Sequence, residues 1–314
     1  MKKKVAILYS VSYGRNDGAP LYYTNVLQKR DDVEFVHLTP DKTAENFGPF
    51  DYTFWVDWGE DGLPWERWYP EGEKWGKKIY VASDTHISPP GRDYRFKTAL
   101  KFDYAFLNQK RAMSEFAEWI LQNRTEGSKL KEWHWLPHAV EPQAYPKFDI
   151  IKKYDVGFIG HLQDQVNYNG FTRVDMLDRA FKAFPNFYFG TRNPLKPTEN
   201  MFEDAARKFC QSKIVLNVSI VDDINMRVFE SMATGSFLLT NYLPTLGKLF
   251  TDGKHLVTYK TLDELVEKGK YYLEHEDERE KIALEGQKEV LSGHTYAHRI
   301  QHIFDIVDRV INKL

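Results

Sequence analysis

The 314-residue sequence contains only one cysteine, Cys210, and no apolar run long enough to cross a bilayer. A single cysteine excludes an intrachain disulfide and a cysteine-based zinc site, and it fits a reducing compartment, so we expect a cytoplasmic protein without a transmembrane segment. The apolar residues 5–9 follow three lysines, but this stretch is too short for the core of a signal peptide. We interpret it as a first β-strand.

The sequence also lacks a large excess of charge of either sign, because it has 43 lysines and arginines and 45 aspartates and glutamates. The net charge of −2 provides no global field that would attract nucleic acid or an acidic membrane. The glycines after the first strand do not have the spacing of a dinucleotide fingerprint or a P-loop. The length is sufficient for two domains with separate cores.

Residues 222–235, with the sequence DDINMRVFESMATG, carry the pattern on which the functional interpretation rests. One apolar run precedes them at 214–218, and another follows at 236–240. Both runs are short, rich in branched residues and bounded by turn formers, which is typical of buried parallel strands. Two consecutive parallel strands need a crossover, so we expect a helix between them.

The expected helix has an apolar stripe and a polar side. Asp223 or Asn225 is predicted to cap its start, and Gly235 suits the left-handed position after its end. Asn225, Arg227 and Glu230 then point away from the packed stripe. The stripe itself consists of Met226, Phe229, Met232 and Ala233.

The position of this helix indicates a ligand site. In open α/β sheets, ligands bind beyond the carboxyl ends of the strands, where helix N-termini present unpaired N–H groups. Arg227 in the first turn suits a diphosphate, and Glu230 one turn later can accept two hydrogen bonds from a vicinal diol. A nucleotide with a ribose has both groups. The alternative is that Glu230 is a solvated helix residue and Arg227 its neighbour.

The sequence from Asn225 to Glu230, followed by Ala-x-Gly and an apolar strand, resembles the C-terminal half of the GT-B glycosyltransferases. It is most similar to the CgeB-like (spore maturation protein) family. The resemblance implies an α/β protein with two Rossmann-like domains facing across a cleft and a last helix that packs back on the first domain. It implies transfer of a hexose or related sugar from a nucleotide-diphosphate sugar, with UDP as the expected nucleotide, to a hydroxyl acceptor. Glu230 would bind the ribose.

The same resemblance implies that no metal or cofactor is needed besides the nucleotide sugar, because helix ends and basic groups stabilise the leaving diphosphate. The pair Asp222-Asp223 is therefore interpreted as helix capping and not as a metal motif. We expect an acceptor domain at residues 1–146 and a nucleotide-sugar domain at 147–295. Residues 296–314 form an amphipathic helix that returns to the first domain.

Further donor contacts are expected in the second domain. Its first strand ends in Gly160, where a ligand can approach the backbone, and the resemblance assigns phosphate binding to Gly160, His161 and Arg173. Arg192 follows the next strand and is expected near the base, or else it is a surface arginine. Asp222 stands where retaining glycosyltransferases of the Glu-x7-Glu type have their first glutamate.

Three residues are candidates for catalysis. Asp84 and His86 follow residues 77–82, which are expected to form the fourth strand. The pKa of an unperturbed histidine, about 6.5, would let His86 take a proton from the acceptor. If the enzyme inverts, one of them is the base; if it retains, neither is required. The alternative is that Asp84 caps the next turn and His86 closes it. His138 is expected to face the cleft, or to be satisfied by the linker backbone.

The acceptor is expected to meet Tyr13, Gly14 and Trp58, the last in a loop rich in tryptophan between residues 58 and 75. These tryptophans could equally pack against one another to fix the loop. Two other functions remain open, a catalytically silent GT-B module that binds a glycan or partner, and a sugar-nucleotide epimerase. The acceptor could be a protein, a glycan, a small molecule or a modified nucleic acid.

Overall fold

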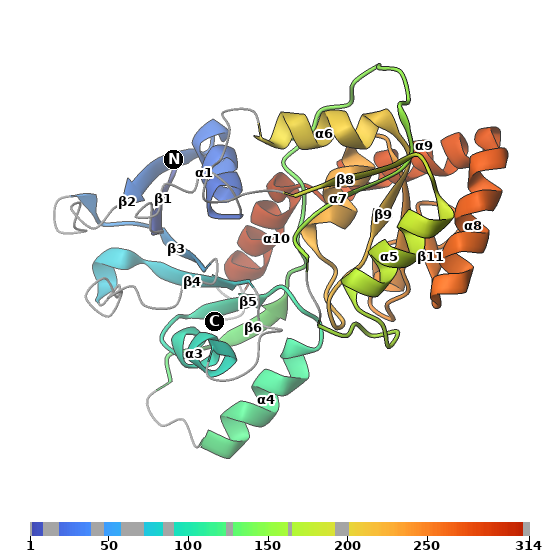
Figure 1. The fold of residues 1–314 in the computed structure, drawn as a ribbon. Helices are drawn as coiled ribbons and strands as arrows, with labels where there is room; N and C mark the ends of the chain where they lie inside the picture. Colours follow the sequence, from blue (N-terminus) through green and yellow to red (C-terminus); the bar gives the residue numbers. More distant parts are fainter. Residues whose placement is uncertain are drawn as a thin grey trace. The chain divides into compact units, whose positions relative to one another are not determined.

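The computed structural model describes residues 2–8, 19–38, 47–57, 72–83, 91–123, 128–162, 165–191 and 201–309. The chain divides into two compact units, one of residues 1–137 with 296–314 and one of residues 138–295 (Figure 1). The sequence placed the boundary at residue 146. Residues 138–146 belong to the second unit, where the Val140 amide donates to the His294 carbonyl at 3.1 Å.

The first unit is built on a parallel sheet with the strand order β2-β1-β3-β4-β5-β6. Its apolar strands alternate with helices, as the sequence predicts. The strands are β1 (Lys3–Leu8), β2 (Val33–Leu38), β3 (Tyr52–Asp57), β4 (Lys77–Ala82), β5 (Tyr104–Leu107) and β6 (Glu132–Trp135). The helices are α1 (Ala19–Lys29), α3 (Gly91–Ala99), α4 (Ala112–Asn123) and α10 (Tyr296–Arg309), with a 3-10 turn at Glu73–Trp75.

The last helix, α10, packs on the first unit, as the sequence predicts. Tyr296 lies 5.0 Å from Tyr22 of α1 between ring centroids. Phe304, further along α10, contacts the rings of Tyr52 and Phe54 on β3 at 5.0 and 6.0 Å. The apolar spacing seen in the sequence of α10 therefore reflects burial against α1 and the sheet.

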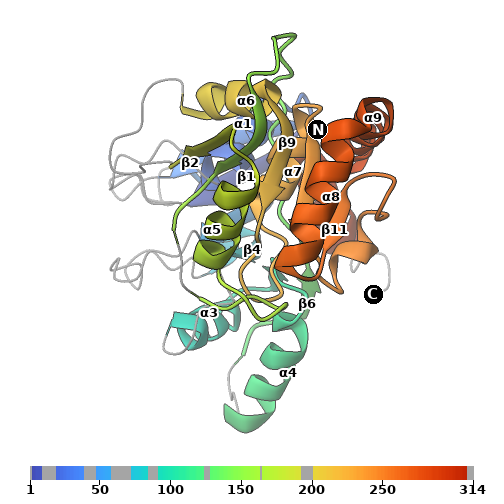
Figure 2. The same ribbon diagram turned by 45° about the vertical axis from the view of Figure 1, so that its right-hand side comes forward.

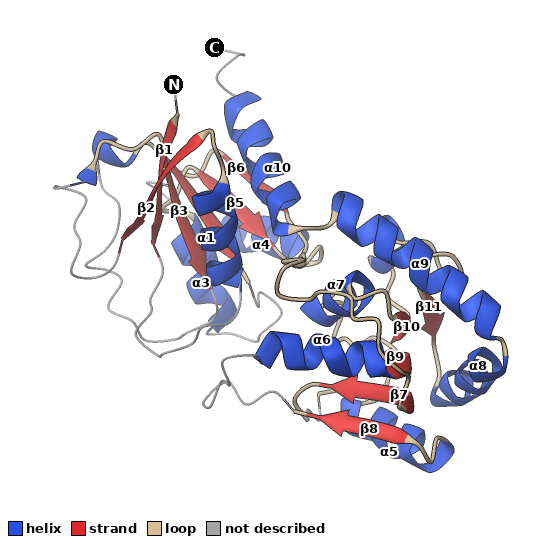
Figure 3. Ribbon diagram, turned by 90° about the horizontal axis from the view of Figure 1, so that it is seen from above, coloured by secondary structure: helices blue, strands red, loops and turns tan. Residues whose placement is uncertain are grey.

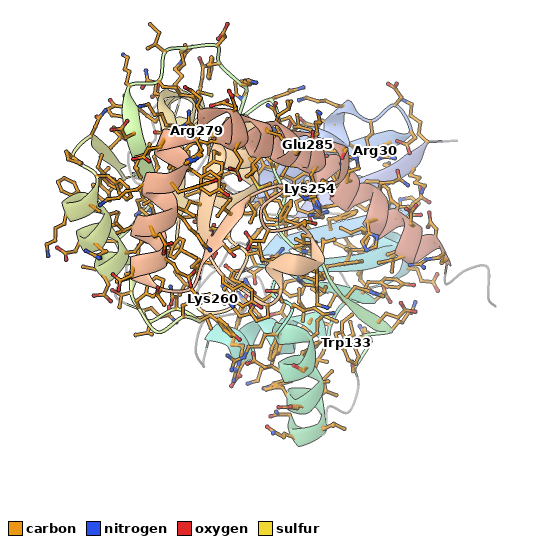
Figure 4. All side chains as sticks on the ribbon, turned by 90° about the vertical axis from the view of Figure 1, so that its right-hand side faces the viewer. Arg30, Trp133, Lys254, Lys260, Arg279 and Glu285 are labelled. Atoms are coloured by element: carbon orange, nitrogen blue, oxygen red, sulfur yellow. The ribbon has the colours of Figure 1, made fainter. Side chains whose placement is uncertain are left out.

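A second aromatic cluster joins α3 and α4 to the sheet. Phe96 of α3 lies 4.8 Å from Phe116 of α4, and Phe102 stacks on Tyr80 of β4 at 5.3 Å. Trp133 of β6, labelled in Figure 4, meets Phe116 edge-on at 5.6 Å. Strand β6 was not predicted from the sequence.

The second unit has a parallel sheet with the strand order β11-β10-β9-β7-β8. Helices α5 and α8 cover one face, and α6 and α7 the other (Figures 2 and 3). The strands are β7 (Tyr154–Ile159), β8 (Phe187–Gly190), β9 (Ser212–Asn217), β10 (Phe237–Asn241) and β11 (Val257–Tyr259). The helices are α5 (Arg173–Ala183), α6 (Met201–Gln211), α7 (Met226–Ala233), α8 (Leu262–Glu274) and α9 (Glu276–Gly293), with a 3-10 turn at Leu246–Lys248. Within the described ranges, no helix has the length and apolar character that a membrane span requires.

The carboxylate of Asp308 holds the end of α10 on the sheet of the first unit. It accepts hydrogen bonds from Lys3 and Lys77 at 2.8 and 2.9 Å, and another from the hydroxyl of Tyr52. Burial raises the pKa of Asp308, but these three hydrogen bonds outweigh that effect and lower it from 3.8 to about 2.

We expect Asp308→Asn to destabilise the protein by about 1 kcal/mol near neutral pH, a value that allows for solvent screening of a carboxylate that is 37% exposed. The pKa is lower in the folded state, so the stabilisation is present above the unfolded pKa near 4 and is lost as the pH falls toward 2. Thermal unfolding between pH 7 and 3 should show the gap between wild type and variant closing below about pH 4. Asp305→Asn, on the exposed side of α10, is the control. A difference in Tm between wild type and Asp308→Asn that does not depend on pH would contradict the lowered pKa of Asp308.

Candidate functional site

The strand-helix-strand element around residues 222–235 is present as predicted. Strand β9 pairs in parallel with β10, with Ile214 beside Phe237, and α7 forms the crossover between them. Gly235 has a φ of 72°, which confirms the left-handed position after the helix. In the loop before α7, Val221 has a φ of 53°, a conformation that costs a β-branched residue about 1–3 kcal/mol.

The first turn of α7 is not capped by its N-cap side chain. Asn225 occupies the N-cap position, but its side chain makes no capping hydrogen bond, so this part of the prediction is wrong. Its amide nitrogen is turned inward, toward Asn217 Oδ1 at 3.2 Å and the Val218 carbonyl at 3.3 Å. Its Oδ1 is buried and has no hydrogen-bond partner in the described part of the chain. Asn225 itself therefore supplies no side-chain acceptor to the positive end of α7.

Arg227 reaches back from α7 to the carboxyl ends of β7 and β9. Its Nη1 donates to Asn217 Oδ1 at 2.7 Å, and its guanidinium lies 4.5 Å above the ring of Phe158. Its Nη2 lies only 2.0 Å from the position that a Cβ on residue 160 would occupy. Residue 160 must therefore be a glycine, because the Cβ of any other residue would displace the guanidinium of Arg227 from its place against the backbone.

Arg173, at the start of α5, connects two loops. Its Nη1 donates to the His161 carbonyl at 2.6 Å, and its Nη2 to the Val218 carbonyl at 3.1 Å. The residue is 6% exposed, and burial lowers its pKa to about 10, so it remains charged at neutral pH. No described carboxylate forms an ion pair with it. The structure therefore places Arg173 as a buried cation that joins the loops after β7 and β9, beside the exposed side chain of His161.

Glu230 is not a solvated helix residue, which was the alternative interpretation of the sequence. Its residue is 1% exposed, and its Oε1 accepts a hydrogen bond from the hydroxyl of Tyr145 at 2.7 Å. The reason is that the segment before β7 lies on the polar side of α7 and covers it. Tyr145 was not predicted as a functional residue, because it precedes residue 147, where the nucleotide-sugar domain was expected to begin.

Asn217, the last residue of β9, connects several of the site residues. It was also not predicted as a functional residue. It is fully buried at the end of β9, and its amide nitrogen donates to Thr240 Oγ1 at 2.9 Å. Its carbonyl accepts from the hydroxyl of Tyr259 at 2.8 Å. Asp222, in the loop above, accepts a hydrogen bond from Thr245 Oγ1 at 2.7 Å. A polar residue that ends an apolar strand was the available signal.

The remaining candidates divide into one residue that is described and several that are not. His138 is 5% exposed, at the start of the second unit. Within the described ranges, no group of three or more histidine, cysteine, aspartate or glutamate side chains is arranged to hold a metal ion. Asp84, His86, Arg192, Tyr13, Gly14 and Trp58 lie outside the described residues, so their roles stay predictions.

Comparison with known proteins gives one match to a protein family by sequence and further matches to solved structures by fold. Residues 189–305 match the protein family described as glycosyl transferase-like, a range that includes α7 and Glu230. Comparison with curated proteins gave no match.

Several solved structures match over nearly the whole chain. A sucrose-phosphate synthase from Thermosynechococcus elongatus has a TM-score of 0.63 at 7% identity, with 100% of both chains covered. HepE from Anabaena, in complex with UDP and glucose, has a TM-score of 0.63 at 12% identity, with 98% of this chain and 100% of HepE covered. A trehalose 6-phosphate synthase from Burkholderia multivorans has a TM-score of 0.59 at 11% identity, with 100% of both chains covered. The chain therefore has the two-domain fold of the GT-B glycosyltransferases, and most of its second half has a glycosyltransferase-like sequence.

Proposed function

We propose that the protein is a glycosyltransferase that takes a hexose or related sugar from a UDP-sugar and transfers it to a hydroxyl acceptor without a metal ion. The observation that carries this proposal is the arrangement on α7. Arg227 and the first turn of the helix lie at the carboxyl edge of the sheet, and the buried carboxylate of Glu230 follows one turn later.

The diphosphate would bind at the positive end of α7. Backbone N–H groups at a helix N-terminus favour phosphate, and here the N-cap side chain does not compete for them. Arg227 adds a guanidinium whose position is already fixed by Asn217 and Phe158. These groups would stabilise the charge that develops on the leaving diphosphate, which is the part that a metal ion plays in other enzymes.

The ribose would bind to Glu230. A carboxylate can accept hydrogen bonds from both hydroxyls of a vicinal diol, and such charge-assisted bonds are strong inside a protein. The solved complexes of HepE with UDP and glucose and with UDP-glucose support UDP as the nucleotide. Asp84 or His86 would act as the base if the sugar is transferred with inversion.

We expect UDP at one hundred times its dissociation constant to stabilise the wild-type protein by about 2.7 kcal/mol, seen as a rise of several degrees in Tm. Glu230→Ala should lose most of this rise, because the ribose contact is gone. The measurement is a thermal-shift screen of UDP, GDP, TDP and CMP and their common sugars.

Two further variants control this screen. Glu274→Ala removes an exposed carboxylate at the end of α8 and should behave as wild type. Glu230→Gln keeps an oxygen for Tyr145 and separates binding from folding. If no nucleotide stabilises the wild type, the proposed function is wrong. Donor turnover that releases no free nucleotide would instead indicate an epimerase.

Gly160→Ala should weaken UDP binding about tenfold or more and lower Tm no more than Arg227→Ala does, because the new Cβ displaces the guanidinium of Arg227. Isothermal calorimetry on Gly160→Ala, Arg227→Ala and the double variant tests this. The losses of UDP affinity in the two single variants should not add in the double variant, because both substitutions take the same guanidinium away from the site. Gly293→Ala, where an added Cβ meets no atom within 4 Å, is the matched control. Additive losses would show that Gly160 acts independently of Arg227.

A further inference from the structure

Tyr145 lies in an irregular segment before β7, yet its side chain is only 1% exposed. The backbone is fixed on both sides of it. On one side, the Ala144 amide donates to the Glu141 carbonyl at 3.0 Å. On the other side, the Phe148 amide donates to Cys210 Sγ at 3.3 Å. The phenol therefore extends from a segment whose backbone is hydrogen-bonded on both sides of Tyr145.

The hydroxyl of Tyr145 donates to Glu230 Oε1 at 2.7 Å. The ring lies 5.8 Å from Phe202 of α6, which supports it on another side. A buried carboxylate needs hydrogen-bond donors, because losing water without replacement costs several kcal/mol. Rotation about the last torsion of a glutamate is also broad, and a donor on one oxygen restricts it.

We propose that Tyr145 is a positioning residue, which holds the Glu230 carboxylate in the orientation that receives the ribose hydroxyls of the donor. The inference rests on the proposed function, since it takes the Glu230–ribose contact as given. A hydrogen bond on Oε1 before the nucleotide arrives lowers the ordering cost of binding. The carboxylate itself touches the ligand, and Tyr145 acts only through it.

This role differs from simple structural support in one measurable way. If Tyr145 orients Glu230, its hydroxyl matters only for ligands that have ribose hydroxyls. If it merely supports the fold of the site, every ligand of the site should lose affinity when the hydroxyl is removed. The test therefore compares UDP with 2′,3′-dideoxy-UDP, which keeps the base and the diphosphate but lacks the diol.

For the wild type we expect UDP to bind about 10- to 100-fold more tightly than dideoxy-UDP, as hydrogen bonds to a charged group allow. In Tyr145→Phe the ratio should fall to about threefold through weaker UDP binding, with dideoxy-UDP affinity unchanged. Calorimetry gives both constants. In turnover assays the KM for the UDP-sugar should rise while kcat stays within about twofold, because positioning affects donor binding.

The chain offers a matched control. Tyr271 on α8 also donates its hydroxyl to a glutamate, Glu278 at 2.9 Å, but it does so on the exposed surface of the second unit. Tyr271→Phe removes that hydrogen bond and should leave the affinities for UDP and dideoxy-UDP as in the wild type. Phe202→Leu removes ring support behind Tyr145 without touching Glu230, and it should give a smaller loss that is again confined to UDP. This variant keeps the test decisive if Tyr145→Phe does not fold.

The outcomes separate the two proposals. If the wild type does not distinguish UDP from dideoxy-UDP, the ribose contact of Glu230 is wrong, and the proposed site fails with it. If the wild type distinguishes them, Glu230→Ala does not, and Tyr145→Phe still does, the positioning role alone is overturned. Equal loss of both ligands in Tyr145→Phe would also overturn it.

Discussion

The hydrogen bonds of the Asn217 side-chain amide hold together the carboxyl edge of the sheet in the second unit. Its nitrogen holds Thr240 on β10, and its oxygen holds Arg227 and Asn225 from α7. A side chain with only donors or only acceptors could not make both sets of contacts. Because the residue is fully buried, each contact that is lost would leave a polar group without water to replace it.

Two arginines gather at this edge for different reasons. The guanidiniums of Arg173 and Arg227 lie 5.7 and 4.5 Å from the same ring, that of Phe158. Arg173 uses two nitrogens to join loops, whereas Arg227 lies against Gly160 at the open end of α7. Together they raise the positive potential at this edge, where we propose that a diphosphate binds.

The sequence was sufficient to predict the strands and helices around the site, but not the contacts that their side chains make. Apolar runs and turn residues predicted β9, α7, β10 and the conformation of Gly235, since these depend on local pattern. The cap by Asn225 was wrong, and the burial of Glu230 by Tyr145 was not predicted, because contacts outside the helix decide both. Helical periodicity places a residue on a side of the helix, but it does not say what covers that side. The same limit explains why Tyr145 and Asn217 were missed.

The first unit is assembled from the two ends of the chain, with α10 in contact with α1 and β3. A ribosome makes residues 1–137 early and α10 last, and the continuous segment 138–295 emerges between them. The second unit is thus synthesised in full before the helix that buries Tyr22, Tyr52 and Phe54. During synthesis, the second half of the protein can fold as one piece before the first half is finished.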